Sequence, residues 1–175
     1  MRWLLLAGLA ACLPALAQEE RRLEAGGETI VYTLRRPGPN AHLPDPAATL
    51  APTSAIGTAR LVVQYLARGD IEEAALLSNT PRERFERYKE RLEMWGEEQF
   101  KQLFGEYALP ENAIVAEIAI GDHSLLIWNL ARQKQLAGQF FVRIEDRVLM
   151  DDTLNPTREQ LRRVLQAYRS GALAD

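Results

Sequence analysis

Three adjacent residues, Asp122, His123 and Ser124, carry the side-chain types of an orienting acid, a base and a nucleophile. A catalytic triad needs these groups to meet in a relay from acid to base to nucleophile. Consecutive residues at a turn and the start of a strand cannot form that relay. We therefore interpret Asp122 as a turn residue that bonds the local backbone.

Two further acids, Asp151 and Asp152, follow the last apolar segment before the final helix pattern. A carboxylate in an apolar pocket has a raised pKa and serves as a general base, so Asp122, Asp151 and Asp152 are candidate catalytic residues, with His123 beside them. Asp151, Asp152 and His123 also have donor types suited to a divalent cation. The competing interpretation places both aspartates at a solvated sheet edge, and it leads us to predict no metal and no cofactor.

A set of aromatic residues is the one feature that indicates a ligand pocket. The set consists of Tyr88, Trp95, Trp128, Phe140 and Phe141. We predict Trp128, Phe141, Tyr88 and Trp95 as ligand-binding residues, because a curved sheet under a helix leaves a concavity. Phe141 lies on the otherwise polar face of its predicted strand, which favours it and Trp128 as lining residues. Packing in a core explains the same residues without a ligand.

The signatures of several enzyme classes are absent. The chain has no G-x-x-x-x-G-K, G-x-G-x-x-G, H-E-x-x-H, G-x-S-x-G or C-x-x-C motif, so nucleotide-binding, zincin, α/β-hydrolase and thioredoxin-like functions lack support. Its 175 residues are 47% hydrophobic, which is enough for one domain with a packed core. A formal net charge of −3 provides no overall basic field, so we expect no nucleic-acid partner.

Residues 1–17 have the features of a secretory signal peptide. Arg2 gives a positive start, an apolar run follows, and Ala15-Leu16-Ala17 forms an A-x-A site, so we predict cleavage after Ala17. The run is broken by Pro14 and is shorter than the roughly twenty residues that span a bilayer. No later segment is long and apolar enough to be a transmembrane span.

Cys12 supports an alternative interpretation of the same segment. Leu9-Ala10-Ala11-Cys12 resembles a lipoprotein box, which would anchor the protein to a membrane through Cys12. Cys12 is the only cysteine, so cleavage after Ala17 leaves no thiol for a disulfide, for catalysis or for a metal. Neither Asn79 nor Asn155 begins an N-glycosylation sequon. These features favour a bacterial periplasm as the location.

The remaining chain divides into a strand segment, a linker and a domain. Residues 18–36 contain a β-branched and aromatic run after two glycines, which predicts one strand or the second arm of a hairpin. Residues 37–52 hold five of the nine prolines and are predicted to form an extended linker in which His42 is solvated. Residues 53–175 are predicted to form a single α+β domain.

Helical periodicity fills the first part of this domain. Helices are predicted after caps at Thr53 or Ser54, at Asp70 and at Thr80, with Gly96 as a kink or an end. The third helix mixes glutamates with Arg82, Arg84, Arg87 and Arg91. Mixed charges at such spacing are typical of a solvated face, with a protein-docking surface as the alternative.

Strand periodicity follows from Ile114. Four segments with a period of two are predicted as strands, at 114–120, 124–131, 136–144 and 147–150. The second of them is apolar on both faces, which indicates a strand covered on both sides. The turns between them are too short for crossovers, so the sheet is antiparallel. We predict an α+β fold with helices on a curved four-stranded meander and a C-terminal helix capped by Thr157.

The order of these elements resembles the nuclear-transport-factor-2-like superfamily, also called the cystatin-like roll, over residues 53–152. The resemblance is carried by a helix, a second helix, a meander of strands and the connecting run Arg68-Gly69-Asp70-Ile71-Glu72-Glu73-Ala74. It implies helices packed into a curved sheet that forms a cone with an apolar pocket. Members of the superfamily include isomerases, cyclases, dehydratases and exported domains without catalysis. No catalytic acid or tyrosine of the superfamily has a matching position here.

Three functional hypotheses follow. The first is an exported, non-catalytic domain that binds a small apolar molecule or an envelope partner protein, with a homodimer left open. The second is a small lyase or isomerase with a buried carboxylate base. The third is a structural or inhibitory protein whose N-terminal strand pairs with the sheet of a partner.

Overall fold

The computed structural model describes residues 18–44 and 51–173. The predicted signal peptide, its cleavage site after Ala17 and the alternative anchor at Cys12 lie outside the described residues. None of the helices within these two ranges is both long and apolar enough to cross a bilayer.

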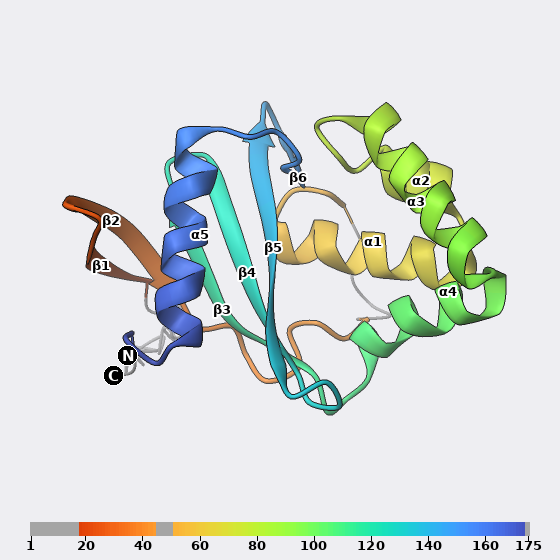
Figure 1. The fold of residues 1–175 in the computed structure, drawn as a ribbon, viewed down its shortest axis with the longest axis horizontal. Coiled ribbons are helices and arrows are strands. Elements are labelled where there is room, and N and C mark those ends of the chain that lie inside the picture. Colours follow the sequence, from red (N-terminus) through yellow and green to blue (C-terminus); the bar gives the residue numbers. More distant parts are fainter. Residues whose placement is uncertain (1–17, 45–50, 174–175) are drawn as a thin grey trace, which may run out of the picture.

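Six strands form one antiparallel sheet in chain order. They are β1 (Gln18–Ala25), β2 (Glu28–Arg35), β3 (Ala113–Ile120), β4 (His123–Leu130), β5 (Gln135–Ile144) and β6 (Arg147–Met150). The meander β3–β6 matches the four predicted strands, but the prediction of a four-stranded sheet is wrong. The N-terminal segment forms a hairpin that adds β1 and β2, because Thr33–Arg35 pair with Glu117–Ala119 of β3. The rest of this hairpin projects beyond the sheet (Figure 1).

Five α-helices and one 3₁₀ turn complete the fold. They are α1 (Ala55–Arg68), α2 (Ile71–Ala75), α3 (Pro81–Trp95), α4 (Glu97–Gly105), the turn η1 (Glu106–Ala108) and α5 (Pro156–Arg169). The side chain of Ser54 accepts a hydrogen bond from the backbone amide of Gly57 and so caps α1. Gly96, with φ of 78°, ends α3 and separates it from α4. The cap predicted at Thr157 is wrong: Asn155 caps α5 by accepting the amide of Arg158, and Pro156 begins the helix.

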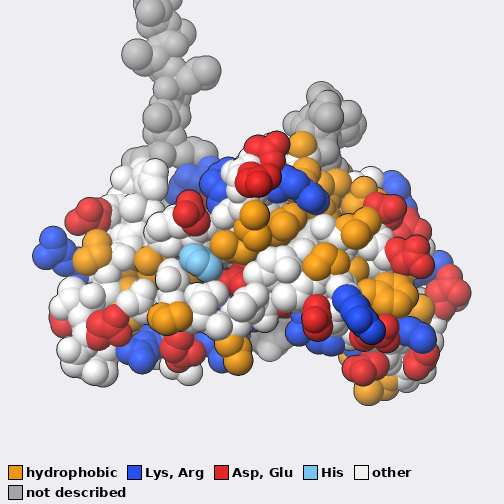
Figure 2. All heavy atoms as spheres, turned by 90° about the horizontal axis from the view of Figure 1, so that it is seen from above, with side chains coloured by type: hydrophobic (Ala, Val, Ile, Leu, Met, Phe, Trp, Pro, Cys, Tyr) orange, Lys and Arg blue, Asp and Glu red, His pale blue; other side chains and the backbone are white. Residues whose placement is uncertain are grey.

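The sheet has a hydrophobic core on each face. Helices α1–α4 cover one face and α5 covers the other (Figure 1). Strand β4 supplies both cores, with Leu126 and Trp128 toward α1–α4 and Leu125 and Ile127 toward α5. The helical end of the molecule carries interspersed acidic and basic side chains, at the right of Figure 2.

The segment between β2 and α1 packs against the domain around His42. This residue is 3% exposed, its Nε2 lies 3.0 Å from the carbonyl oxygen of Leu109, and its ring meets Trp128 edge-on. The guanidinium of Arg60 also donates to the carbonyl of Ala41. The prediction that His42 is solvated is therefore wrong, because an aromatic edge and a backbone acceptor fix the ring against the core.

Gly138 in β5 marks a close approach between the sheet and α5. A Cβ atom at this position would lie 2.5 Å from Cδ2 of Leu165 and 3.1 Å from Cδ1 of Leu125. We expect Gly138→Ala to lower the free energy of unfolding by about 1–3 kcal/mol, since overpacking forces neighbours to shift. Chemical denaturation measures this change. The matched control is Gly38→Ala, where a Cβ meets nothing within 4 Å. Equal stability of the two variants would contradict the close packing of α5 on β5.

Candidate functional site

A cavity of about 290 Å³ lies beside β5, between the helices and the sheet. This volume is just below the roughly 300–1,000 Å³ of small-molecule pockets. We call it the β5 cavity. Its lining residues are Val62, Leu66, Arg84, Tyr88, Arg91, Phe104, Tyr107, Gly138, Gln139, Phe140, Met150, Asp151, Asp152 and Arg158.

The cavity exists because β6 is shorter than β5. Strand β6 pairs with Phe141–Ile144 only, which leaves the first part of β5 as a free edge. On that edge, the carbonyl of Phe140 accepts a hydrogen bond from the backbone amide of Asp151. Because backbone groups alternate sides along a strand, Gly138 also directs its N–H and C=O to that edge. The cavity is thus lined by strand backbone as well as by side chains.

One wall of the cavity is a chain of aromatic rings. The ring of Phe104 meets Tyr88 edge-on at 6.3 Å and stacks on Tyr107 at 6.5 Å, and Tyr107 meets Trp128 edge-on at 5.2 Å. Burial raises the pKa of both Tyr88 and Tyr107, although the nearby guanidinium of Arg91 acts in the opposite direction. Both phenols therefore stay protonated at neutral pH, and the wall is uncharged.

Asp152 ties the cavity to α3 through a bidentate ion pair. The Nε of Arg84 donates to Oδ2 at 2.6 Å, and Nη2 donates to Oδ1. Arg87 contacts Oδ2 at 3.0 Å, and the hydroxyl of Ser78 donates to the same oxygen at 2.6 Å. The Asp152 side chain is only 6% exposed. Arg84 and Arg87 therefore do not form the purely solvated face predicted for the third helix.

Asp151 joins four segments of the chain. Its Oδ1 accepts from the side-chain amide of Asn79 at 2.9 Å and from the backbone amide of Thr153 at 3.1 Å. Its Oδ2 accepts from Nδ1 of His123 and from the side-chain amide of Asn155, both at 3.1 Å. The side chain is 1% exposed. This carboxylate fixes the start of β4, the start of α3 and the cap of α5 relative to one another.

The predicted catalytic candidates thus separate into two groups. Asp122 is exposed at the turn between β3 and β4 and does not line the cavity. The predicted bond from its side chain to the local backbone is wrong, since the side chain has no hydrogen bond within the described residues. Asp151, Asp152 and His123 come together, but protein donors already occupy both oxygens of each carboxylate. The arrangement leaves no free oxygen to take a substrate proton. Within residues 18–44 and 51–173, no group of three or more His, Cys, Asp or Glu side chains is placed to hold a metal ion.

The four predicted ligand-binding aromatics lie in three different environments. Tyr88 lines the β5 cavity, as does Phe140 from the wider aromatic set. Trp128 and Phe141 are each 1% exposed and form the core beneath it. The indole of Trp128 donates to Oε1 of Gln139 at 3.0 Å, and Gln139 lines the cavity. Trp128 therefore supports the cavity without facing it.

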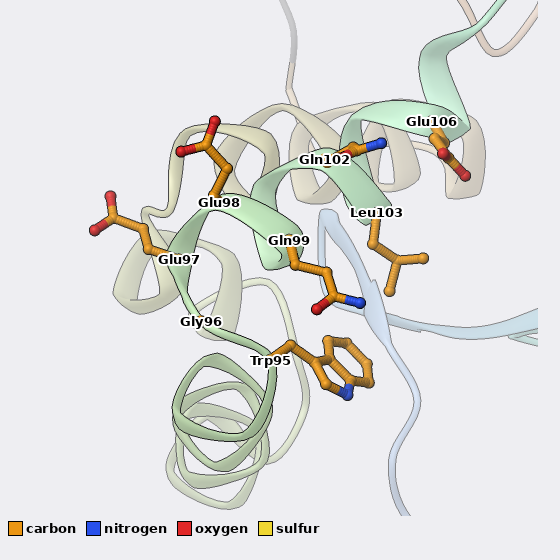
Figure 3. A pocket seen from close by; sticks show the side chains of 8 residues that line it. All are labelled: Trp95, Gly96, Glu97, Glu98, Gln99, Gln102, Leu103 and Glu106. Atoms are coloured by element: carbon orange, nitrogen blue, oxygen red, sulfur yellow. The ribbon is translucent and has the colours of Figure 1, made fainter.

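Trp95 lies in a separate, open groove at the junction of α3 and α4, with a volume of about 580 Å³. Figure 3 shows the side chains of Trp95, Gln99 and Leu103 on one side of this groove, while those of Glu97 and Glu98, which also line it, extend to the opposite side from Trp95. The groove has no aromatic wall comparable to that of the β5 cavity. We therefore take the β5 cavity as the candidate site.

Sequence reasoning missed Tyr107, Gln139 and the arginines as site residues. Arg84, Tyr88 and Arg91 are spaced four and three residues apart along α3, which places them on one helical face. That spacing was the available signal. Arg158 gave no such signal, because its place in the cavity depends on how α5 meets β5.

Comparisons of the chain with family models, with curated proteins and with solved structures find no match. The resemblance to the nuclear-transport-factor-2-like superfamily therefore stays a prediction.

Proposed function

We propose that the protein is an exported, non-catalytic domain that binds a small apolar molecule in the β5 cavity. The observation that carries this proposal is the continuous ring wall of Tyr88, Phe104 and Tyr107 facing a cavity of about 290 Å³. An apolar ligand gains free energy by covering such a wall, at about 25 cal/mol per Å² of apolar surface removed from water. Export rests on the predicted signal peptide at residues 1–17.

The hydrogen bonds that Asp151 and Asp152 already accept favour binding over catalysis. A general base needs a free oxygen within reach of the substrate proton. Both carboxylates at the cavity instead accept protein donors, and those contacts hold α3, β4 and α5 in place. The arrangement is that of a rigid scaffold around a cavity.

The N-terminal hairpin gives less support for a partner-binding strand. Strand β1 is the outer edge of the sheet and carries Glu19, Glu20, Arg21 and Arg22 in succession. Charged residues on an edge strand discourage pairing with another chain. We therefore propose a small molecule as the ligand.

Binding of a neutral aromatic probe tests the proposed function. We expect naphthylacetamide to bind with a dissociation constant of about 0.01–1 mM, since ligands of this kind gain about 0.3 kcal/mol or more per non-hydrogen atom. Val62→Trp fills the cavity from α1 and is expected to weaken binding at least about tenfold. Isothermal titration calorimetry measures both, with circular dichroism to confirm folding.

Met94→Trp is the matched control for this experiment. Met94 is 75% exposed on α3 and does not line the cavity. We expect this variant to bind naphthylacetamide as the wild type does. Failure of the wild type to bind, or equal binding by Val62→Trp, would contradict the proposed function.

A further inference from the structure

We infer that the ligand of the β5 cavity is an amphipathic acid, whose apolar body lies on the aromatic wall and whose carboxylate is held by Arg91 and Arg158. This inference rests on the proposed function and names the chemical class of its ligand.

Arg158 lines the cavity and contains a buried donor without a partner. It lies in the first turn of α5, its guanidinium is stacked over the ring of Phe140 at 5.1 Å, and Nη1 donates to the carbonyl of Thr153 at 3.3 Å. Its Nε is buried without a hydrogen-bond partner within the described ranges. Burial lowers the pKa of Arg158, opposed by the charges of Asp151 and Asp152. A buried donor without a partner is costly, and an anionic acceptor would remove that cost.

Arg91 is the second guanidinium, and it has no hydrogen bond or ion pair within residues 18–44 and 51–173. It lies on the cavity face of α3, exposed at the mouth, and its guanidinium packs against the ring of Trp95 at 5.9 Å. Its charge acts on the hydroxyls of both Tyr88 and Tyr107. Arg84, the third cavity arginine, is paired with Asp152 through its Nε and Nη2 atoms.

The charge balance of the cavity selects an anion. Three arginines and two aspartates line it, so one positive charge remains uncompensated. Arg87 adds another, because it also pairs with Asp152. An anion can bind here without breaking any of the bonds that hold Asp151 and Asp152. A planar carboxylate suits the fork of donors that a guanidinium presents, and the free backbone edge at Gly138 adds an N–H donor.

The apolar body of the ligand distinguishes this site from one for a small anion. The rings of Phe104 and Tyr107 and the side chains of Val62 and Leu66 line the same cavity as the two arginines. Binding of the carboxylate alone would leave this apolar surface in water. We therefore expect acid and apolar body to be required together.

A matched pair of probes tests the inference on the whole protein. Naphthylacetate and naphthylacetamide have the same apolar body and differ in charge. We expect the acid to bind about tenfold more tightly than the amide in isothermal titration calorimetry, the usual scale of a charge-assisted hydrogen bond. Arg91→Met and Arg158→Met should each remove most of that preference, because the affinity for the acid falls more than the affinity for the amide. Arg82→Met, an exposed arginine of α3 outside the cavity, should change neither affinity.

Four other binding results would each contradict a different claim. Equal binding of acid and amide would overturn the inference while the proposed function stands. Loss of acid binding in Arg82→Met equal to that in Arg158→Met would overturn the assignment to the cavity arginines. Displacement of naphthylacetate by acetate or inorganic phosphate alone would overturn the requirement for an apolar body. Failure of both probes to bind would overturn the proposed function and this inference with it.

Discussion

Asp151→Ala is expected to lower the free energy of unfolding by about 3–5 kcal/mol, the usual cost of removing a buried charged partner. The substitution leaves four donors, from Asn79, Thr153, His123 and Asn155, without their acceptor. Three of these residues lie where α3, β4 and α5 begin or are capped, so their loss loosens the packing of both helical layers on the sheet. Chemical denaturation monitored by tryptophan fluorescence measures the change.

Asp122→Ala is the matched control for Asp151. Asp122 is exposed one residue before β4, and its side chain has no hydrogen bond or ion pair within the described residues. We expect this variant to change stability by less than about 0.5 kcal/mol, as for most surface substitutions. If the two variants lost equal stability, Asp151 would not be the junction that the structure shows.

Trp128→Ala on its own is expected to lower the free energy of unfolding by about 3–5 kcal/mol, as for other buried aromatic residues. The indole is enclosed by His42 and Tyr107, and its Nε1 donates to Gln139. Truncation removes the support behind both Tyr107 and Gln139. We therefore expect weaker binding of naphthylacetamide as well as lower stability.

Trp95→Ala provides the control for Trp128. Its indole is half-buried in the groove at the α3–α4 junction and contacts Arg91 across its ring face. We expect this variant to cost about 1 kcal/mol and to retain the affinity for naphthylacetamide. A loss of stability as large as that of Trp128→Ala would contradict the difference in burial between the two tryptophans.

The strands were predictable where the apolar residues mark a buried face, on one side of the strand or on both. The alternation from Ile114 onward identified β3, and the apolar faces of Leu125 and Leu126 identified β4 as covered on both sides. Strand β1 gave no such signal, because its run of charged residues alternates only between exposed and partly exposed positions. The run after Gly27 predicted β2, but not its pairing with β3, where Thr33 lies opposite Ala119, 86 residues away. The prediction of a four-stranded sheet failed on this long-range pairing.

Local capping chemistry predicted some of the helix starts. Ser54 is the cap of α1, and Pro81 begins α3. Asp70 and Thr80 precede α2 and α3 as predicted, but neither side chain makes a capping hydrogen bond. The cap of α5 was misplaced because Thr157 and Gln160 also fit a capping pattern, while Asn155 followed by Pro156 fits it better. Local sequence thus offered two starts, and the hydrogen bond from Asn155 to Asp151 favours the earlier one.

The cavity itself depends on contacts that periodicity does not encode. Arg84 and Asp152 are 68 residues apart, and nothing local links them. A helical pattern says which residues share a face, but not which distant charge meets that face. Gly138 was a second local signal beside the helical spacing of Arg84, Tyr88 and Arg91, since a glycine within a strand marks a close approach of other groups.

Binding in the β5 cavity is tested most directly by the nitrogen–proton correlation spectrum of the protein titrated with naphthylacetate. We predict shifts of the backbone resonances of Tyr107, Gly138 and Gln139, and of the indole resonance of Trp128 through its bond to Gln139. The indole resonance of Trp95 should shift far less. A spectrum that does not change, or shifts centred on the groove around Gln99 and Gln102, would contradict the account.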